Sequence, residues 1–180
     1  MSQQNYVYSA LAVRDPAGFG EAKSLVASFR AEGLSVVRSC DLTRRQRELM
    51  LRHGFLNVLT KGWYYLQNVQ GMQSAPLLSF VARYCTERFD EAWHLSPELS
   101  LLLHAGIRKL HSKLVVYTPL GKNGQLHLAG FGTLIDYKVK EKLPDNALTA
   151  IEGLRVIRLP YALLKCSEAF LRQHRDEIVR

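Results

Sequence analysis

The sequence predicts an α+β protein, and three observations support this prediction. The chain has 180 residues, 47% hydrophobic and 22% charged, a composition typical of one ordinary globular domain or two small ones. Several segments repeat apolar residues at helical spacing, and short runs rich in β-branched and aromatic residues lie between them. The expected helices are 19–32, 44–53, 76–89, 97–105, 161–170 and 171–179, and the expected strands are 55–59, 63–66, 114–118, 125–129 and 154–159.

The helix predicted over 44–53 is the best specified of these elements. Thr43 and Gln46 have the capping-box spacing, in which each side chain bonds the other residue's backbone N–H, and Gly54 follows the helix. At 100° per residue, the helix has two faces. The basic face holds Arg44, Arg45, Arg47, Glu48, Leu51 and Arg52, and the opposite face holds Gln46, Leu49, Met50 and His53. Three interpretations are open for Leu51 on the basic face: contact with a thymine methyl, contact with a neighbouring helix, or no contact.

A hairpin follows this helix directly. The strands 55–59 and 63–66 are separated by Thr60-Lys61-Gly62, and Gly62 can adopt the left-handed conformation that a hairpin loop needs. Because side chains alternate along a strand, we expect one or two of Trp63, Tyr64 and Tyr65 to be buried. A capped basic helix followed by a hairpin predicts a winged helix-turn-helix domain over 1–68.

The second predicted domain is an α+β lobe over 75–180, connected by the polar segment 67–74. Its helix at 97–105 has Ser96 at the N-cap and Pro97 in the first turn. The strands 114–118 and 125–129 should form a hairpin through the turn 121–124. The first helix, 19–32, ends before Gly33, and the segment 34–40 suits either a strand or one helical turn.

The charge balance favours a polyanionic partner. The chain has 24 Lys and Arg against 16 Asp and Glu, a formal net charge of +8 and a pI near 9.6. Nucleic acid and anionic membrane both fit such a charge. Between Leu34 and Leu66 there are six basic and two acidic residues, the local concentration that phosphate binding requires. A solvated surface helix is the alternative.

We therefore predict contact with double-stranded DNA. The helix 44–53 would enter the major groove with its N-terminal half near the bases, and Lys61 at the tip of the hairpin would contact an adjacent phosphate or the minor groove. The predicted DNA-binding residues are Arg38, Arg44, Arg45, Arg47, Arg52 and Lys61.

The sequence offers no pattern typical of catalysis. Its six histidines lack metal-ligand spacing, no GxSxG or reactive-cysteine motif is present, and the three cysteines form no CxxC pair. His104 lies on an apolar helix face, where a hydrogen-bonded core histidine is the favoured interpretation over a catalytic one. The turn 121–124 lacks the rest of a P-loop. We expect no enzyme activity, no cofactor and no metal.

The location expected from the sequence is the cytoplasm. No apolar run approaches the roughly 18 to 20 residues that span a bilayer. The first ten residues have neither the basic region nor the apolar region of a signal peptide.

Three strings carry a resemblance to a known family: RRQRELMLRHGFLNVLTKGWYYL, FVARYCTERFDEAWHLSPELSLLLHAG and GLRVIRLPYALLKCSEAFL. Over roughly 42–170 the chain resembles AbiEi-like type IV antitoxins and transcriptional regulators, and most closely the version at the N-terminus of many bacterial Fic proteins. The resemblance implies a winged helix before an α+β domain. It marks the five basic residues of 44–61 as facing DNA, and Trp63, Trp93, Leu101 and His104 as framework.

The resemblance also implies a function. Such antitoxins repress their own operon and neutralise a nucleotidyltransferase-like toxin encoded nearby without a stable complex. A homodimer would suit an inverted-repeat operator. The Fic active-site signature is absent, because Asn123-Gly124 is followed by Gln125 and no matching histidine precedes it. The alternative expectation is a non-catalytic interaction module of a Fic-like or phage-defence assembly.

Overall fold

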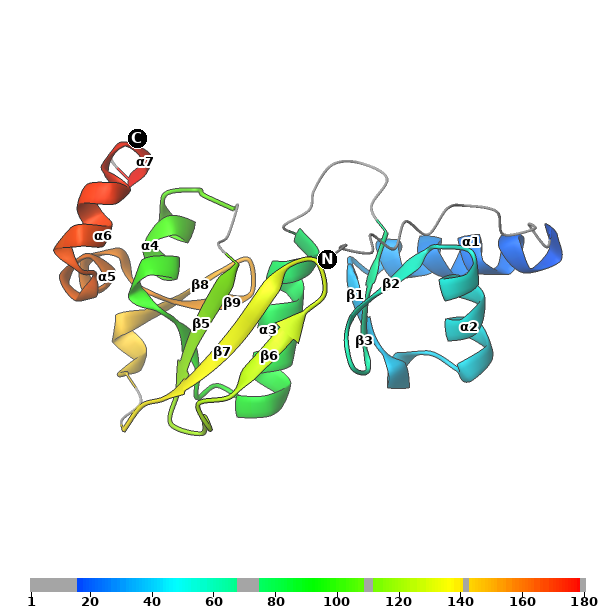
Figure 1. The fold of residues 1–180 in the computed structure, drawn as a ribbon, viewed down its shortest axis with the longest axis horizontal. Coiled ribbons are helices and arrows are strands. Elements are labelled where there is room, and N and C mark those ends of the chain that lie inside the picture. Colours follow the sequence, from blue (N-terminus) through cyan, green and yellow to red (C-terminus); the bar gives the residue numbers. More distant parts are fainter. Residues whose placement is uncertain (1–15, 68–74, 109–111, 141–142, 179–180) are drawn as a thin grey trace, which may run out of the picture.

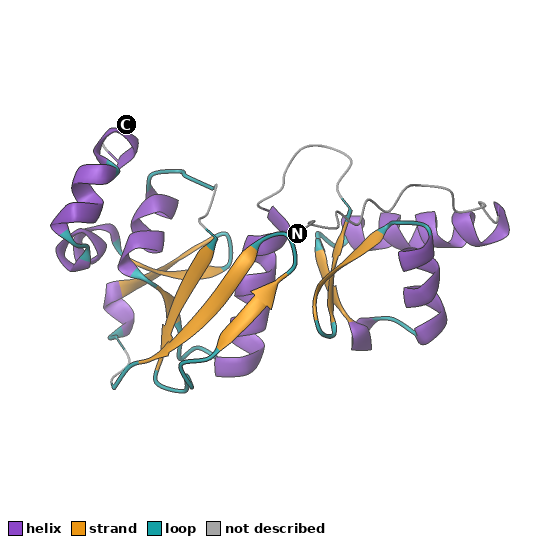
Figure 2. Ribbon diagram, viewed as in Figure 1, coloured by secondary structure: helices purple, strands orange, loops and turns teal. Residues whose placement is uncertain are grey.

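The computed structural model describes residues 16–67, 75–108, 112–140 and 143–178, and its elements are mixed α and β, as predicted. They form two lobes with separate sheets (Figures 1 and 2). The predicted linker 67–74 lies almost wholly outside the described residues, since only Gln67 is described.

The N-terminal lobe is a three-stranded antiparallel sheet with two helices on its outer side (Figure 2). The strand order is β1-β3-β2, so the last strand of the hairpin lies in the middle. The elements are α1 (Pro16–Ala31), β1 (Val36–Arg38), a 3-10 turn η1 (Ser39–Asp41), α2 (Arg44–Arg52), β2 (Leu56–Thr60) and β3 (Trp63–Leu66). The segment that sequence left open between strand and helix therefore contributes one strand and one 3-10 turn.

The capped helix is confirmed. Thr43 Oγ1 accepts from the N–H of Gln46, and the Gln46 side chain accepts from the N–H of Thr43 at 2.9 Å. Leu49 and Met50 are buried against α1 and the sheet, as expected for the apolar face. Leu51 is half-buried and packs against the same hydrophobic cluster, so it is part of the lobe's core rather than of the basic surface.

The hairpin is also confirmed, with a shorter turn than expected. Thr60 belongs to β2 and pairs with Trp63 across a bulge, which leaves Lys61 and Gly62 as the turn. Gly62 has φ of 78°, the left-handed backbone that glycine tolerates at little cost.

The C-terminal lobe has a four-stranded sheet in the order β4-β5-β7-β6 and a separate two-stranded sheet, β8-β9. Its elements are α3 (Ala75–Phe89), β4 (His94–Leu95), α4 (Pro97–His104), β5 (Lys113–Thr118), β6 (Gln125–Leu128), β7 (Gly132–Lys138), a 3-10 turn (Asp145–Ala147), β8 (Leu148–Ile151), β9 (Leu154–Ile157), α5 (Leu159–Lys165), α6 (Glu168–Gln173) and α7 (Arg175–Ile178). Ser96 caps α4 as predicted, accepting from the N–H of Leu99.

The predicted hairpin between β5 and β6 is wrong. β7 lies between them, parallel to β5 and antiparallel to β6. The loop between β5 and β6 crosses the end of β7, where Asp136 accepts hydrogen bonds from the N–H groups of Lys122 and Gly124 at 3.2 and 2.6 Å. Asn123 Oδ1 in turn accepts from the N–H of Lys138. These bonds hold the loop on β7.

The two C-terminal helices predicted at 161–170 and 171–179 also differ from the structure, which divides this region into α5, α6 and α7. The break after α5 occurs because Ser167 acts as an N-cap and accepts from the N–H of Phe170. A residue at an N-cap has extended backbone, so it starts a new helix instead of continuing the old one.

The sheet of the N-terminal lobe is covered on both faces. Val37, Leu56 and Leu66 pack against α1 and α2. Val36, Leu59, Trp63 and their neighbours join the core of the C-terminal lobe. The Trp63 ring meets Phe80 of α3 edge-on at 5.1 Å between centroids, and Tyr65 meets Phe131 in the same way at 5.3 Å. The lobes therefore share one core, although their sheets are separate.

Candidate nucleic-acid interface

The N-terminal half of α2 presents two highly exposed arginines. The side chains of Arg44 and Arg45 are 84% and 82% exposed. Arg44 Nε donates to Glu48 Oε1 at 2.8 Å, one turn along the same helix, and Arg45 reaches Glu21 of α1 at 3.3 Å. Surface ion pairs of this kind contribute little stability, so both guanidinium groups can exchange their carboxylate for a phosphate.

Three further predicted residues lie on or near the same surface. Arg52 and Lys61 are exposed and Arg47 is half-buried. Within the described ranges, none of the three side chains forms a hydrogen bond or ion pair with another side chain. They can therefore contact a polyanion without breaking a side-chain hydrogen bond or ion pair of the described residues.

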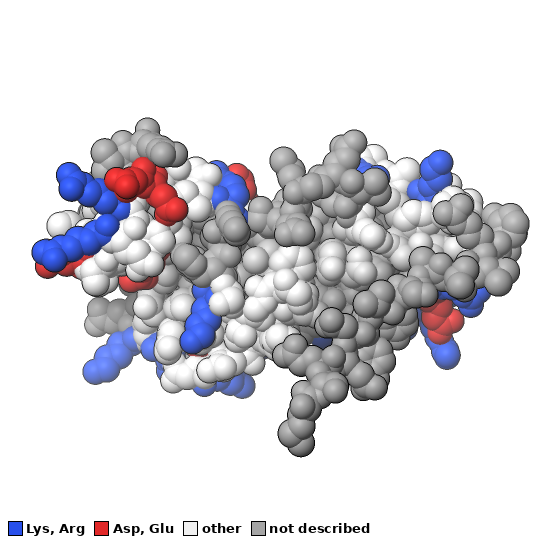
Figure 3. All heavy atoms as spheres, turned by 45° about the horizontal axis from the view of Figure 1, so that its top comes forward, with Lys and Arg blue, Asp and Glu red and all other residues white. Residues whose placement is uncertain are grey.

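Glu48 makes this surface less basic than the arginines alone would. Its hydrogen bond with Arg44 and the positive charges of Arg44, Arg47 and Arg52 lower the pKa of the Glu48 carboxyl below its usual value. The group is thus ionised at neutral pH. Lys and Arg side chains project from the end of the molecule formed by α1 and α2, with a smaller acidic group among them (Figure 3).

The hairpin turn lies at the same end of the lobe as the start of α2 (Figure 1). The N–H of Ser39 in η1 donates to the carbonyl of Gly62 at 2.9 Å, and η1 leads through Leu42 to the cap of α2. This bond ties the tip of the hairpin to the segment that begins the helix. Lys61 and the first turn of α2 therefore belong to one continuous region of the lobe.

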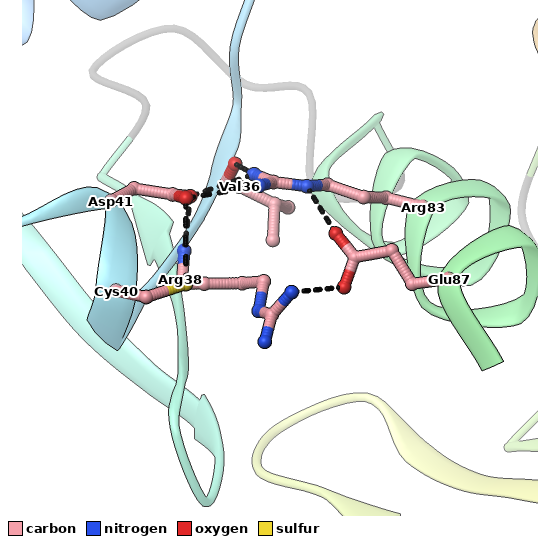
Figure 4. A network of polar contacts seen from close by, with 6 residues as sticks. All are labelled: Val36, Arg38, Cys40, Asp41, Arg83 and Glu87. Atoms are coloured by element: carbon pink, nitrogen blue, oxygen red, sulfur yellow. Dashed lines mark hydrogen bonds and ion pairs between the residues drawn. The ribbon is translucent and has the colours of Figure 1, made fainter.

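Arg38 is placed differently from the other predicted residues. It lies on β1, facing the C-terminal lobe, and its Nη1 donates to Glu87 of α3 (Figure 4). Its guanidinium carbon lies 5.5 Å from the centroid of the Trp63 ring. The side chain is still partly exposed, but its main contacts stabilise the junction between the lobes. We call Arg38, Asp41, Arg83 and Glu87 the interlobe clasp.

Arg83 of α3 makes most of the clasp's bonds. It donates to Asp41 from Nη2 at 3.1 Å, to Glu87 from Nε at 3.0 Å and to the carbonyl of Val36 from Nη1 at 3.4 Å (Figure 4). Its guanidinium carbon also lies over the Trp63 ring, 5.5 Å from the ring centroid, which is a cation–π contact. One arginine thereby connects β1, η1 and β3 to α3.

The electrostatics of the clasp follow from these bonds. Burial by itself would raise the pKa of the Asp41 carboxyl, but the bonds from Arg83 and from the N–H of Arg38 outweigh it and lower that pKa. Burial would likewise lower the pKa of Arg83, and the two carboxylates outweigh it and raise that pKa. All four charges of the clasp are therefore satisfied by partners within it.

The aromatic residues of β3 pack inside the protein. Trp63 is buried, and Tyr64 and Tyr65 are half-buried against the two hydrophobic clusters on opposite sides of the sheet. This confirms the expectation that at least one of them is buried. Stacking of Trp63 on a nucleic-acid base would require the lobes to separate.

Other predicted features were also located. His104 is half-buried and its Nε2 lies 2.9 Å from the carbonyl of Ile157, so the expected hydrogen bond is present. Within the described part of the chain, no group of three or more His, Cys, Asp or Glu side chains could hold a metal ion. None of the described helices is both long and apolar enough to cross a membrane.

Local sequence patterns do not identify Glu21, Asp41 or Arg83 as partners of these arginines. Only Glu87 had a local signal, because it lies four residues after Arg83 on a helix. The other pairs join residues that are distant in sequence. No protein family model, curated protein or solved structure matches this chain.

Proposed function

We propose that this protein is a sequence-specific DNA-binding transcriptional regulator, with α2 as its recognition helix. The single observation that carries the proposal is that α2 buries Leu49 and Met50 while Arg44 and Arg45 project into solvent at its capped N-terminal end. Recognition helices contact bases mainly with that half. The exposed Lys61 at the same end of the lobe suits an additional phosphate contact.

We further propose that the N-terminal lobe is a winged helix. The order helix, strand, helix, hairpin and the sheet order β1-β3-β2 support this assignment. In this scheme α1 is the first helix of the motif and packs on α2, with β1 and η1 between them in the chain. The hairpin β2-β3 is the wing.

The resemblance to AbiEi-like antitoxins gives the proposal its biological form. The protein would repress its own operon and oppose a toxin encoded nearby, acting as a homodimer on an inverted-repeat operator. Such a function requires a cytoplasmic protein. It needs no catalytic group or cofactor.

The test is a fluorescence-anisotropy titration of the full chain with duplex DNA from upstream of its own gene, at low and moderate salt. We expect saturable binding that weakens with salt, because each neutralised phosphate releases counterions. An unrelated duplex of equal length measures the non-specific term. Absence of binding at low salt, or equal affinity for both duplexes, would contradict sequence-specific recognition.

A matched pair of variants separates the proposed site from a general charge effect. Arg172 forms an i,i+4 pair with Glu168 on α6, like Arg44 with Glu48 on α2, and is 78% exposed. Arg44→Ala should lower affinity and reduce the salt slope by about one. Arg172→Ala removes the same charge and should leave both unchanged.

A second candidate function is protein binding by α5. Leu159, Tyr161, Leu163 and Leu164 are large hydrophobic residues exposed on this helix, and Leu164 is 83% exposed. Such a patch suits a protein partner, here a component of a Fic-like or phage-defence assembly encoded nearby. A pull-down with that gene product should then fail with Leu164→Ser and persist with Arg44→Ala. The converse result would favour DNA-dependent association.

A further inference from the structure

The C-terminal lobe contains a half-open cavity of about 350 Å³ that is separate from α2 and from the clasp. It lies where β4, β5 and the start of α4 meet the end of α5. Its size is at the lower end of the range for small-molecule sites. The lining residues are His94, Pro97, Tyr117, Val139, Leu143, Ile157 and Lys165.

One polar group in this cavity has an unused hydrogen-bonding position. His94 is only 7% exposed, and its Nδ1 lies 2.8 Å from the carbonyl of Leu95. A carbonyl oxygen only accepts, so Nδ1 carries the proton and Nε2 of the neutral ring is an acceptor. In the described part of the chain, Nε2 has no hydrogen-bond partner. Burial lowers the pKa of His94, which favours this neutral form.

The walls of the cavity select the shape of an occupant. The rings of His94 and Tyr117 form a pair in this lining, with centroids 5.7 Å apart. Pro97, Val139, Leu143 and Ile157 provide apolar surface around it. A flat aromatic ring fits such walls better than a flexible polar chain, because ring faces and edges pack favourably at these distances.

The charge of Lys165 indicates a second property of the occupant. Lys165 is exposed and lines the cavity, and its positive charge contributes to the lowered pKa of His94. An ammonium group at the mouth of an apolar cavity favours an anionic substituent on the occupant. His94 thus offers an acceptor in the cavity, and Lys165 supplies a positive charge among the lining residues.

We infer that this cavity binds a small aromatic carboxylate bearing a hydroxyl or N–H donor, with the donor on His94 Nε2 and the carboxylate at Lys165. The inference does not depend on DNA binding. It assigns the C-terminal lobe a ligand site in addition to its packing against the N-terminal lobe.

The test is a two-dimensional NMR titration of the ¹⁵N-labelled full chain with 4-hydroxybenzoate. We expect saturable shifts at amides around the cavity, with a Kd of about 1 mM for a ligand of this size. Benzoate, which lacks the donor, and methyl 4-hydroxybenzoate, which lacks the carboxylate, should bind several-fold more weakly.

Variants complete the test. His94→Leu should weaken 4-hydroxybenzoate binding about tenfold but leave benzoate binding unchanged. Lys165→Met should weaken both carboxylates about threefold and leave the methyl ester unchanged. Lys165 is exposed, so this variant keeps the test valid if His94→Leu fails to fold. Lys122→Met removes an exposed lysine elsewhere and should change nothing.

Four results would overturn the inference, of which the first three are no saturable shift, shifts confined to the arginines of α2, and equal affinity for all three probes. The fourth is binding at the cavity whose affinity changes with neither His94→Leu nor Lys165→Met. Each outcome is independent of whether the protein binds DNA.

Discussion

The basic face of α2 and the interlobe clasp are both built around arginines, yet those arginines have different surroundings. On α2, the guanidinium groups project into solvent and pair, where they pair, with carboxylates one turn away or on the adjacent helix. In the clasp, Arg38 and Arg83 lie over Trp63 and pair across the lobe junction. A basic residue in the sequence therefore indicates a binding surface only where its side chain is not already paired within the fold.

The largest expected effect comes from removing the Trp63 ring, over which both arginines of the clasp lie. Trp63→Ala should lower the free energy of unfolding by about 3–5 kcal/mol, because it opens a cavity in the core shared by the lobes. Urea denaturation followed by circular dichroism measures this change. Val58 is exposed in the same hairpin, so Val58→Ala should cost far less, and an equal loss from the two variants would contradict the shared core.

Removing the main donor of the clasp should have a smaller effect. Arg83→Ala should lower the free energy of unfolding by about 1–2 kcal/mol, since it leaves Asp41 and Glu87 with fewer partners at a partly exposed site. Paired with Asp41→Ala in a double-mutant cycle, it gives the coupling energy directly. Independent effects of the two substitutions would show that the pair contributes nothing beyond its parts.

DNA affinity should separate the two sets of arginines. Arg44→Ala combined with Arg47→Ala should weaken binding about tenfold with little change in stability, because each lost phosphate contact removes a modest share of the affinity. Arg38→Ala should do the reverse, lowering stability and leaving affinity nearly unchanged. Anisotropy and denaturation on the same samples give both quantities. If Arg38→Ala loses DNA affinity in a fully folded sample, Arg38 belongs to the proposed DNA-binding surface after all.

The smallest effect concerns pH. The pKa of Asp41 is lower in the folded protein than in the unfolded chain, so its ionised form stabilises the fold. This contribution is fully present above the unfolded pKa and is lost as pH falls through the folded pKa. Asp41→Asn should cost less than about 1 kcal/mol near neutral pH, and the difference should disappear in strong acid. Asp176→Asn, at an exposed position on α7, serves as the control.

Local signals predicted the parts of the fold that depend on neighbours in sequence. The capping box of α2 and the Ser96-Pro97 start of α4 satisfy backbone donors within a few residues, so their patterns can be read directly. The turn after β5 also has a clear pattern, but a turn does not specify which strands pair. The place of β7 between β5 and β6 involves contacts of this turn with Asp136, more than ten residues away.

The same limit applies to the candidate site. The exposure of Arg44 and Arg45 followed from the helical period, because that period places Leu49 and Met50 on the opposite face. Arg38 instead pairs with Glu87 in the other lobe, and no local pattern in the sequence indicates this pair. The run Trp63 to Leu66 did carry a signal, since four consecutive large apolar or aromatic residues suit a strand covered on both faces.

The covered sheet has a consequence for dissection of the molecule. A fragment ending at residue 67 would keep α1, α2 and the hairpin but would expose Val36, Leu59, Trp63 and Tyr65 together on one flat surface. That surface would favour self-association in place of the missing lobe. The orientation of α2 relative to the C-terminal lobe is set by this packed layer rather than by the length of the connecting segment. For the proposed DNA-binding dimer, a fixed lobe junction would leave the spacing of the two α2 helices to the dimer contact alone.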